Sequence, residues 1–362
     1  MRIGILTWFD VLNYGSVFQA YALQECVKSM GNTVEILRHD RVLPKYYANE
    51  LGSISFVNIV KWLRNQSPGR VRYRTTTKKK YAAFESFRDE YLNIGSHYSN
   101  AHDDAVLIGS DQVFDINGLY YPFQFGQGID SKSISTYAPS FGETTAETLE
   151  ESGHYSEIIS NIKSLIYVNA RDENTERILS DIRKEKIDVV IDPVLLYSFS
   201  KEKTIWNKRL IKGKYCIVYT WGGYTTEKDF SESCVRFAKA NNLKLVSVGE
   251  YRPWCDMQFA SASPIEFFEL YMYADMVLTN MFHGTCFSII MQKPFYSFVM
   301  PHNENKLGDL LKQLKVESQM LRAPGELGSG IPVINYEQVV QVLKEKKDYS
   351  YKCLERAIGS RD

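Results

Sequence analysis

The sequence carries no excess of charge of either sign and no long apolar run. Its 362 residues include 43 Lys and Arg and 43 Asp and Glu, so the formal net charge is zero. A neutral chain is not attracted to nucleic acid by general electrostatics, and we expect no nucleic-acid partner. No stretch of about 18 apolar residues could span a membrane, and residues 1–7 are typical of a strand rather than of a secretion signal. We therefore predict a cytoplasmic protein.

Paired cysteines and glycine-rich cofactor fingerprints are also missing. The six cysteines are dispersed and form no C-x-x-C pair: Cys26, Cys216, Cys234, Cys255, Cys286 and Cys353. This spacing suits neither a disulfide framework nor a metal site, so we predict reduced, buried thiols and no metal. Gly4 does not belong to a G-x-G-x-x-G fingerprint, which argues against a dinucleotide site. The sequence gives no reason to expect a cofactor.

The composition and the periodicity predict an α/β protein with two domains. The chain is 44% hydrophobic and 24% charged, as in globular proteins, and its length suits two domains of roughly 150 residues. Short β-rich runs alternate with longer amphipathic segments, which is typical of parallel sheets flanked by helices. Two such domains that face each other leave a cleft lined by strand carboxyl ends, where ligands bind.

The expected boundaries follow from this alternation. We predict an N-terminal domain over 1–162, a C-terminal domain over 163–335 and a last helix over 336–362 that crosses back to the first domain. Other predicted elements are a helix from Ser16, as its cap, to about residue 30, strands at 105–108, 133–137, 165–168, 189–191 and 276–279, and helices at 285–291 and 306–314.

A basic segment interrupts the first domain. The insert at about 50–80 ends with residues 61–80, which hold eight Lys or Arg and no acidic residue. A solvated insertion is one interpretation. The other is a docking surface for an anionic membrane or a pyrophosphate group, which would bring the protein to the inner face of the membrane.

Two short polar segments of the first domain follow predicted strands. In Asn13-Tyr-Gly-Ser16, the glycine lets the backbone approach a ligand, and the helix start favours an anion or a sugar hydroxyl. In Gly109-Ser-Asp-Gln112, Asp111 suits a general base or a hydroxyl ligand. An ordinary strand-to-helix turn and an N-cap or Asx-turn are the respective alternatives.

Two further segments carry cationic side chains at strand ends. Arg171 can hold a carboxylate or phosphate, and its alternative is an ion pair with Asp172 or a nearby Glu. His283-Gly284-Thr285 opens a predicted helix, where free N–H groups and the macrodipole favour an anion. A satisfied core histidine is the alternative for His283.

Taken together, these motifs resemble the polysaccharide pyruvyl transferase family. The resemblance rests on Ile3-Gly-Ile-Leu-Thr7, Asn13-Tyr-Gly-Ser-Val-Phe-Gln-Ala-Tyr-Ala-Leu-Gln24, Ile108-Gly-Ser-Asp-Gln-Val-Phe114, Arg171-Asp172, Ile191-Asp-Pro-Val194 and the stretch from Asp275 to Pro294. It implies two Rossmann-like domains in a glycosyltransferase-B-like arrangement with an interdomain cleft. It also implies transfer of the pyruvate unit of phosphoenolpyruvate to a sugar as a cyclic ketal, with release of phosphate, in exopolysaccharide or capsule biosynthesis.

The resemblance places the phosphoenolpyruvate contacts at Arg171 and at the turn Met281-Phe-His-Gly284, and we assign the other roles from the chemistry of ketal formation. The donor phosphoenolpyruvate would bind Arg171, His283, Gly284 and Thr285 on the C-terminal side. The catalytic residues would be His283, as acid or phosphate ligand, and Asp111, as base. A sugar acceptor, either lipid-linked or soluble, would lie on the N-terminal side, at Asn13, Gly15, Ser16 and Ser110.

One position departs from the family pattern. Met281 stands where several relatives carry a second arginine, and Arg252 or Lys293 are candidates to replace its charge. Two other functions remain open on the same residues. One is a glycosyltransferase that uses a nucleotide-sugar donor in the same cleft, and the other is a binding protein without catalysis.

Overall fold

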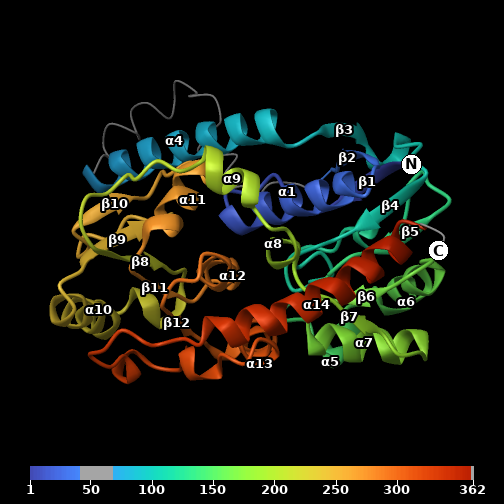
Figure 1. Ribbon diagram of the computed structural model, residues 1–362. Coiled ribbons are helices and arrows are strands. Elements are labelled where there is room, and N and C mark those ends of the chain that lie inside the picture. The colour runs from blue at the N-terminus through green and yellow to red at the C-terminus, as the bar shows by residue number, and fades with distance from the viewer. Residues whose placement is uncertain (41–67, 360–362) are drawn as a thin grey trace, which may run out of the picture.

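The computed structural model describes residues 1–40 and 68–359 and contains two parallel sheets (Figure 1). Within these ranges, the first sheet consists of β1 (Arg2–Leu6), β2 (Thr33–Arg38), β3 (Ile94–His97), β4 (Ala105–Ile108) and β5 (Ile134–Thr136). The second consists of β8 (Tyr215–Tyr219), β9 (Lys244–Val248), β10 (Met257–Phe259), β11 (Met276–Thr279), β12 (Phe295–Phe298) and β13 (Met320–Leu321). Their orders are β3-β2-β1-β4-β5 and β10-β9-β8-β11-β12-β13.

Both orders are those of doubly wound nucleotide-binding sheets, because the chain moves outward from the first strand in one direction and then in the other. The strand pairs of both sheets are parallel. The predicted fold class is therefore confirmed: the chain is an α/β protein with two Rossmann-like sheets in a glycosyltransferase-B-like arrangement.

Helices cover and connect the two sheets. On the side of the first sheet they are α1 (Tyr14–Ser29), α4 (Pro68–Tyr91), α5 (Ala146–Glu151), α6 (Tyr155–Ser164) and α7 (Glu173–Arg183). The following helices are α8 (Pro193–Leu196), α9 (Ser200–Ile205), α10 (Lys228–Ala240), α11 (Pro264–Tyr273), α12 (Phe282–Ile290), α13 (Asp309–Gln313) and α14 (Tyr336–Ala357). In Figure 1, α1 and α8 lie between the two sheets.

Helix α1 joins the cores of the two halves. It begins one residue after Asn13, whose side chain accepts a hydrogen bond from the Gly15 N–H at 2.8 Å, so the predicted cap at Ser16 is wrong. Tyr14 is fully buried, stacks on Phe267 of α11 at 4.3 Å, and donates its hydroxyl to the carbonyl of Ala262 at 2.8 Å. Apolar residues on nearly all sides of α1 are buried because both halves pack on it.

The segment after β5 stays with the first sheet. The Ile166 N–H donates to Ile134 at 2.8 Å, and the Thr136 N–H donates to Tyr167 at 3.0 Å. A two-stranded pair, β6 (Asn169–Ala170) and β7 (Asp188–Val189), follows, so the predicted strand at 165–168 is wrong. The domain boundary between residues 162 and 163 stays a prediction, and these contacts favour a later boundary.

The last helix contacts both halves. Near its start, the Tyr336 hydroxyl donates to the carbonyl of Lys293 at 2.5 Å, and near its end the Tyr351 hydroxyl lies 3.6 Å from the Cys26 Sγ atom of α1. Between them, the Ser350 hydroxyl accepts the Ile191 N–H at 3.1 Å. We propose that α14 is a strap that holds the two sheets together.

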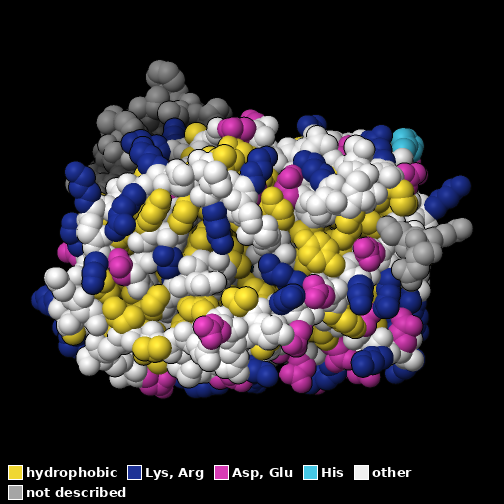
Figure 2. Space-filling view, in the orientation of Figure 1, with side chains coloured by type: hydrophobic (Ala, Val, Ile, Leu, Met, Phe, Trp, Pro, Cys, Tyr) yellow, Lys and Arg dark blue, Asp and Glu magenta, His cyan; other side chains and the backbone are white. Residues whose placement is uncertain are grey.

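The basic segment falls only partly within the described residues. Residues 61–67 lie outside them, and the remainder belongs to α4. On the face shown in Figure 2, Lys and Arg side chains are interspersed with Asp, Glu and hydrophobic side chains. In the described ranges, no helix is both long enough and apolar enough to cross a membrane.

Candidate active site

The two sheets bring the predicted segments to a pair of crevices. The strand order reverses between β1 and β4 in the first sheet and between β8 and β11 in the second. A crevice opens beyond the carboxyl ends of the strands at such a reversal. Asn13 follows β1, Asp111 follows β4, and His283 follows β11. These predicted residues therefore occupy the positions where ligands of such sheets bind.

A cavity of about 380 Å³ lies between the two halves. The first half contributes Asn13, Ser16 and Asp111 to its walls, and the second contributes Tyr219, Trp221 and Met281. A cavity of this volume can hold small polar molecules. Three of the predicted residues thus line one interdomain cavity.

Asp192 connects the two predicted cationic residues. Its Oδ2 atom lies 3.0 Å from Arg171 Nη1 and 3.4 Å from His283 Nε2. Its Oδ1 atom accepts the Val194 N–H at 2.9 Å and so caps α8. All three charged side chains are buried. The structure therefore brings Arg171 and His283 together, although the sequence separates them by more than 100 residues.

Asp111 joins this cluster from the first half. Its Oδ1 atom lies 3.3 Å from Arg171 Nη1, and its Oδ2 atom accepts the Ser16 hydroxyl at 3.3 Å. The φ angle of Asp111 is +72°, and its backbone carbonyl accepts the Ser140 N–H at 2.9 Å. This backbone conformation turns the carboxylate toward Arg171 at the cavity wall. Of the alternatives for this segment, the Arg171–Asp172 ion pair is not formed, whereas Asp172 does serve as an N-cap, since it accepts the Thr175 N–H at 2.9 Å and so begins α7.

Arg171 and Asp192 both stay ionised despite their burial. Burial by itself would raise the pKa of Asp192, but the charges of His283 and Arg171 outweigh burial and lower this pKa to about 2. Burial by itself would lower the pKa of Arg171, but the carboxylates of Asp111 and Asp192 raise it. An ionised guanidinium and the ionised Asp192 carboxylate are therefore fixed beside the cavity.

Two nitrogen atoms of the cluster lack hydrogen-bond partners. Arg171 Nε and His283 Nε2 are buried, and neither finds an acceptor of suitable geometry among the described residues. The Arg171 guanidinium also lies over the Phe282 ring, 4.3 Å from its centroid. Buried donors without acceptors are costly unless a ligand or water satisfies them. This pair of atoms points to an anionic ligand.

Helix α12 begins earlier than the sequence predicts. Its first residue is Phe282, with Met281 as the capping position, so His283 and Gly284 belong to the first turn. The Thr285 N–H already bonds the Met281 carbonyl at 3.1 Å, and its hydroxyl lies 2.6 Å from the Ser297 hydroxyl. We therefore remove Thr285 from the proposed donor site and keep Gly284, whose N–H lies in the first turn of the helix.

Two residues predicted to bind the acceptor make close contacts within the protein instead. Gly15 lies against His283, so closely that a Cβ atom on it would be 2.0 Å from Nδ1. Ser110 is fully buried and donates its hydroxyl to Gln19 at 2.7 Å. The glycine therefore serves close packing of α1 against α12, and we remove the Ser110 side chain from the proposed acceptor site.

The cations suggested as replacements at Met281 lie elsewhere. Arg252 donates to the carbonyls of Thr220 and Thr225 and to Glu250, and Lys293 follows the far end of α12. Lys306, which sequence reasoning missed, is closer to the cluster. It lies in a π-helical turn at Glu304–Gly308 and donates to Gln112 Oε1 at 2.9 Å. Burial and then the charge of Arg171 lower the pKa of Lys306.

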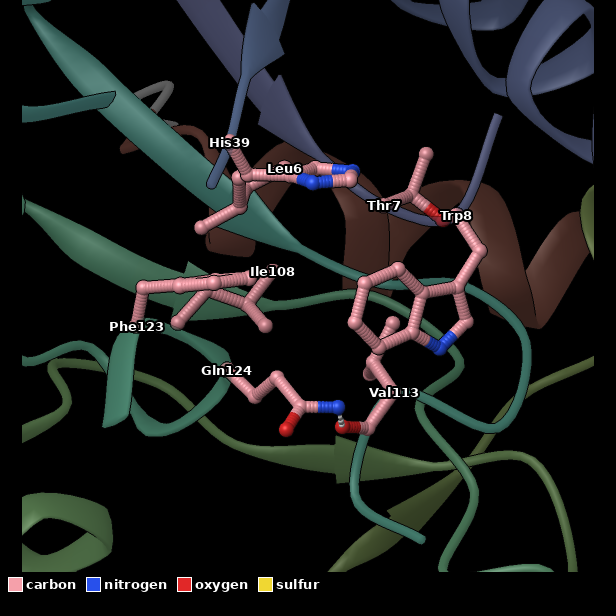
Figure 3. Close-up of a pocket in the computed structure, with 8 residues that line it drawn as sticks. All are labelled: Leu6, Thr7, Trp8, His39, Ile108, Val113, Phe123 and Gln124. Atoms are coloured by element: carbon pink, nitrogen blue, oxygen red, sulfur yellow. Dashed lines mark hydrogen bonds between the residues drawn. The ribbon is translucent and has the colours of Figure 1, made fainter. Parts of the chain in front are cut away.

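A second pocket, in the first half, is packed shut behind Trp8 (Figure 3). The His39 and Phe123 rings are stacked at 5.4 Å, Trp8 meets His39 edge-on, and no space for a water molecule remains. The Trp8 indole N–H donates to the Gln112 carbonyl at 3.2 Å. This packing supports the loop that carries Asp111 and offers no second ligand site.

Metal ligands are not assembled at the cluster. Across residues 1–40 and 68–359, no group of three or more His, Cys, Asp or Glu side chains could hold a metal ion. The six cysteines are all free and buried, as predicted.

Comparison with known proteins gives one family and several distant structures. A family model described as polysaccharide pyruvyl transferase matches residues 13–302. This range contains Asn13, Asp111, Arg171, Asp192 and His283, whereas Lys306 lies just beyond its end. Comparison with curated protein sequences gives no match.

The similar solved structures include sugar-nucleotide and sugar-phosphate enzymes. UDP-GlcNAc 2-epimerase from Methanocaldococcus jannaschii is 11% identical with a TM-score of 0.47, over 95% of this chain and 92% of that one. The Neisseria meningitidis UDP-GlcNAc 2-epimerase bound to UDP-GlcNAc is 13% identical with a TM-score of 0.46, and the match covers 98% of this chain and 94% of that one. Trehalose-6-phosphate synthase OtsA is 9% identical with a TM-score of 0.47 over the whole of both chains.

Proposed function

Because this chain belongs to the polysaccharide pyruvyl transferase family, we propose that it moves the pyruvate unit of phosphoenolpyruvate onto two hydroxyls of a sugar in exopolysaccharide or capsule biosynthesis. The observation that carries the proposal is a pair of buried nitrogen atoms, Arg171 Nε and His283 Nε2, that make no hydrogen bond within the described part of the chain. Both side chains contact Asp192, which gathers them next to the interdomain cavity. We also propose that the protein is cytoplasmic, either free or at the inner face of the membrane.

The donor matches the charges of the cluster. Phosphoenolpyruvate carries a carboxylate and a phosphate, and both need cationic or N–H partners when water is excluded. Arg171 would bind one anionic group, and the first turn of α12 at Gly284 would bind the other. Lys306, whose pKa the charge of Arg171 lowers, would replace the arginine that several relatives carry at the position of Met281.

The reaction needs one acid and one base. A proton added to the methylene carbon leaves positive charge at C2, where the first sugar hydroxyl adds. Phosphate then leaves with the electrons of its C–O bond, and the second hydroxyl adds at the same carbon. Two C–O bonds form and one breaks, and the two hydroxyl protons end on the new methyl group and on phosphate.

The described side chains suit these steps. His283 Nε2, which lies 3.4 Å from Asp192 but makes no hydrogen bond of good geometry to a described residue, would deliver the proton to the methylene carbon. Asp111 lines the cavity and would accept the proton of the sugar hydroxyl, with Ser16 and Asn13 beside it to orient the acceptor. The carboxylates of Asp111 and Asp192 would stabilise the positive charge that develops at C2.

The test is phosphate release from phosphoenolpyruvate in the presence of a galactose-type acceptor. His283→Ala and Arg171→Ala should each lower kcat/KM by about 100-fold or more, because such groups typically contribute this much. His154→Ala and Arg177→Ala are matched controls, since both residues are exposed and lie outside the cluster. Near-wild-type turnover in a folded His283 or Arg171 variant would refute the assignment.

A thermal-shift panel distinguishes the proposal from a nucleotide-sugar glycosyltransferase. A ligand that binds only the folded state raises the midpoint of unfolding, and the rise grows with ligand concentration relative to Kd. Phosphoenolpyruvate should stabilise the wild-type protein and should not stabilise Arg171→Ala. Stabilisation by nucleoside diphosphates and not by phosphoenolpyruvate would favour the glycosyltransferase instead.

A further inference from the structure

One cation of the cavity has no role in the donor site described above. Lys80 lies on α4 and lines the cavity, whereas its neighbours Lys78 and Lys79 are exposed. Its Nζ atom donates to the Gly249 carbonyl at 3.2 Å and lies 4.9 Å from the centroid of the Tyr14 ring. A helix of the first half thus places an ammonium group against the second half, inside the cavity.

No described carboxylate neutralises Lys80. Glu250 is the charged neighbour that acts on it, but the Glu250 Oε2 atom already accepts from Arg252 Nη2 at 2.9 Å. Burial lowers the pKa of Lys80 to about 8, and Glu250 opposes this effect. The Gly249 carbonyl uses one of the three N–H groups of the ammonium. Lys80 thus forms no direct ion pair with a described residue, since its charged neighbour Glu250 pairs with Arg252, and its remaining N–H groups suit an anionic ligand at the cavity wall.

Lys80 belongs to a different part of the cavity from the donor cluster. The Lys80 Nζ atom contacts the Gly249 carbonyl, which follows β9, whereas Arg171 contacts Asp111 and Asp192. A phosphate bound by Lys80 is therefore separate from the donor phosphate at Arg171.

Trp221 lines the same cavity as Gly249 and Glu250. Its side chain is 64% exposed, which is unusual for such a large aromatic residue. Its backbone is nevertheless fixed: its N–H donates to Asn280 Oδ1 at 2.8 Å, and its carbonyl accepts from Asn280 Nδ2 at 2.7 Å. Asn303 holds Asn280 in turn, at 3.1 Å. An exposed indole on a fixed backbone is a preformed surface for an apolar or ring-shaped ligand face.

We propose that Lys80 and Trp221 form an acceptor subsite for a sugar that carries phosphate on its anomeric oxygen. The indole covers one face of the sugar ring, and the ammonium pairs with the phosphate. The subsite rests on the proposed pyruvyl transfer and narrows its acceptor to glycosyl phosphates. Such phosphates are attached either to a lipid or to a nucleoside, and the shared group is the one that Lys80 recognises.

The test compares two acceptors that differ only in the anomeric phosphate. The wild-type protein should prefer the phosphorylated glycan by about tenfold or more in kcat/KM, because a charge-assisted contact contributes that much. Lys80→Met should bring this ratio close to one, and Lys80→Arg should restore most of it. Lys79→Met, one position earlier on the exposed face, should keep the wild-type ratio.

Trp221 requires its own variants. Trp221→Ala should raise the KM for both acceptors by about tenfold, because the sugar ring loses its apolar cover, and Trp221→Phe should raise it less. Lipid-diphosphate and nucleoside-diphosphate forms of the same sugar then show which source is used, through the lower KM.

Several results would overturn the subsite. Equal use of the two acceptors by the wild-type protein would do so, and so would a rise in the KM for phosphoenolpyruvate in Lys80→Met with an unchanged acceptor ratio. If no acceptor supports phosphate release, the proposed function fails. In that case, calorimetric titration with the glycosyl phosphate still tests the subsite, which predicts binding to the wild-type protein and loss of binding in Lys80→Met.

Discussion

Asp192 is the residue on which the geometry of the cluster depends. It contacts both Arg171 and His283 through one oxygen atom and caps α8 through the other. Asp192→Asn keeps the shape of the side chain but removes its charge. We expect kcat/KM to fall by about 100-fold and unfolding free energy to fall by about 3 kcal/mol, because a buried cation loses its partner. Steady-state kinetics and denaturant unfolding measure the two effects.

The stability of the wild-type protein should depend on pH through Asp192. The pKa of Asp192 is lowered to about 2 in the folded protein, against about 3.9 in an unfolded chain. Its stabilising contribution is therefore present above pH 4 and is lost as the pH falls from about 4 to about 2. The wild-type protein should lose more stability over this interval than Asp192→Asn. Parallel losses in the two proteins would contradict the assigned ion pairs.

Residue types at strand ends are a sound guide to part of the site. The sequence marks Asn13, Asp111, Arg171 and His283 because polar side chains follow buried strands, and the structure brings all four to the cavity or to the cluster beside it. Asp192 stands in one of the family-like motifs, but nothing local marks it as a partner of two distant cations. The roles of these residues in catalysis stay predictions.

At the scale of elements, the contact between α1 and α12 determines where His283 lies. A Cβ atom at position 15 would approach within 2.0 Å of the imidazole Nδ1 and within 2.8 Å of its Cβ. Gly15→Ala should therefore force the two helices apart. We expect a loss of about 1–3 kcal/mol in stability and a fall of about 100-fold in kcat/KM, since small displacements misalign reacting groups.

The control for this change is Gly118→Ala. A methyl group at position 118 would have open space around it, with nothing within 4 Å, and the φ angle there is not positive. Unfolding curves and kinetics of the two variants should differ clearly. Wild-type kinetics in Gly15→Ala would show that the close contact is not needed for the reaction.

Element boundaries are harder to predict than element types. Both α1 and α12 begin earlier than expected, at Tyr14 and Phe282, because Asn13 supplies the cap of the first and no side chain caps the second. The strand expected at 165–168 lies instead at Asn169–Ala170. The apolar pattern of a short segment does not determine which of its residues pair with a neighbour.

At the scale of the whole molecule, the buried cysteines report on global unfolding. All six are free and buried, and burial raises the pKa of each thiol, to about 12 for Cys26 and Cys255. Thiolate is the reactive form, so the native protein should react with a thiol reagent far more slowly than a free cysteine does. All six should react rapidly in denaturant, as absorbance of the released reagent would show. Rapid labelling of any of them in the native state would contradict this burial.

The parallel α/β class follows from the alternation of strand and helix patterns, and the strand orders confirm it. The packing between the halves does not follow from that alternation, because it depends on contacts between distant segments. The stacking of Tyr14 on Phe267 and the contact of Lys80 with Gly249 are examples. Such contacts have no periodicity along the chain.

The contact of Gly15 with His283 also has a mechanical meaning. A donor bound beside the imidazole would lie at the interface between the two halves and contact both of them. Its binding free energy would therefore add to the stability of that interface. Donor binding and the association of the two halves would then be thermodynamically coupled.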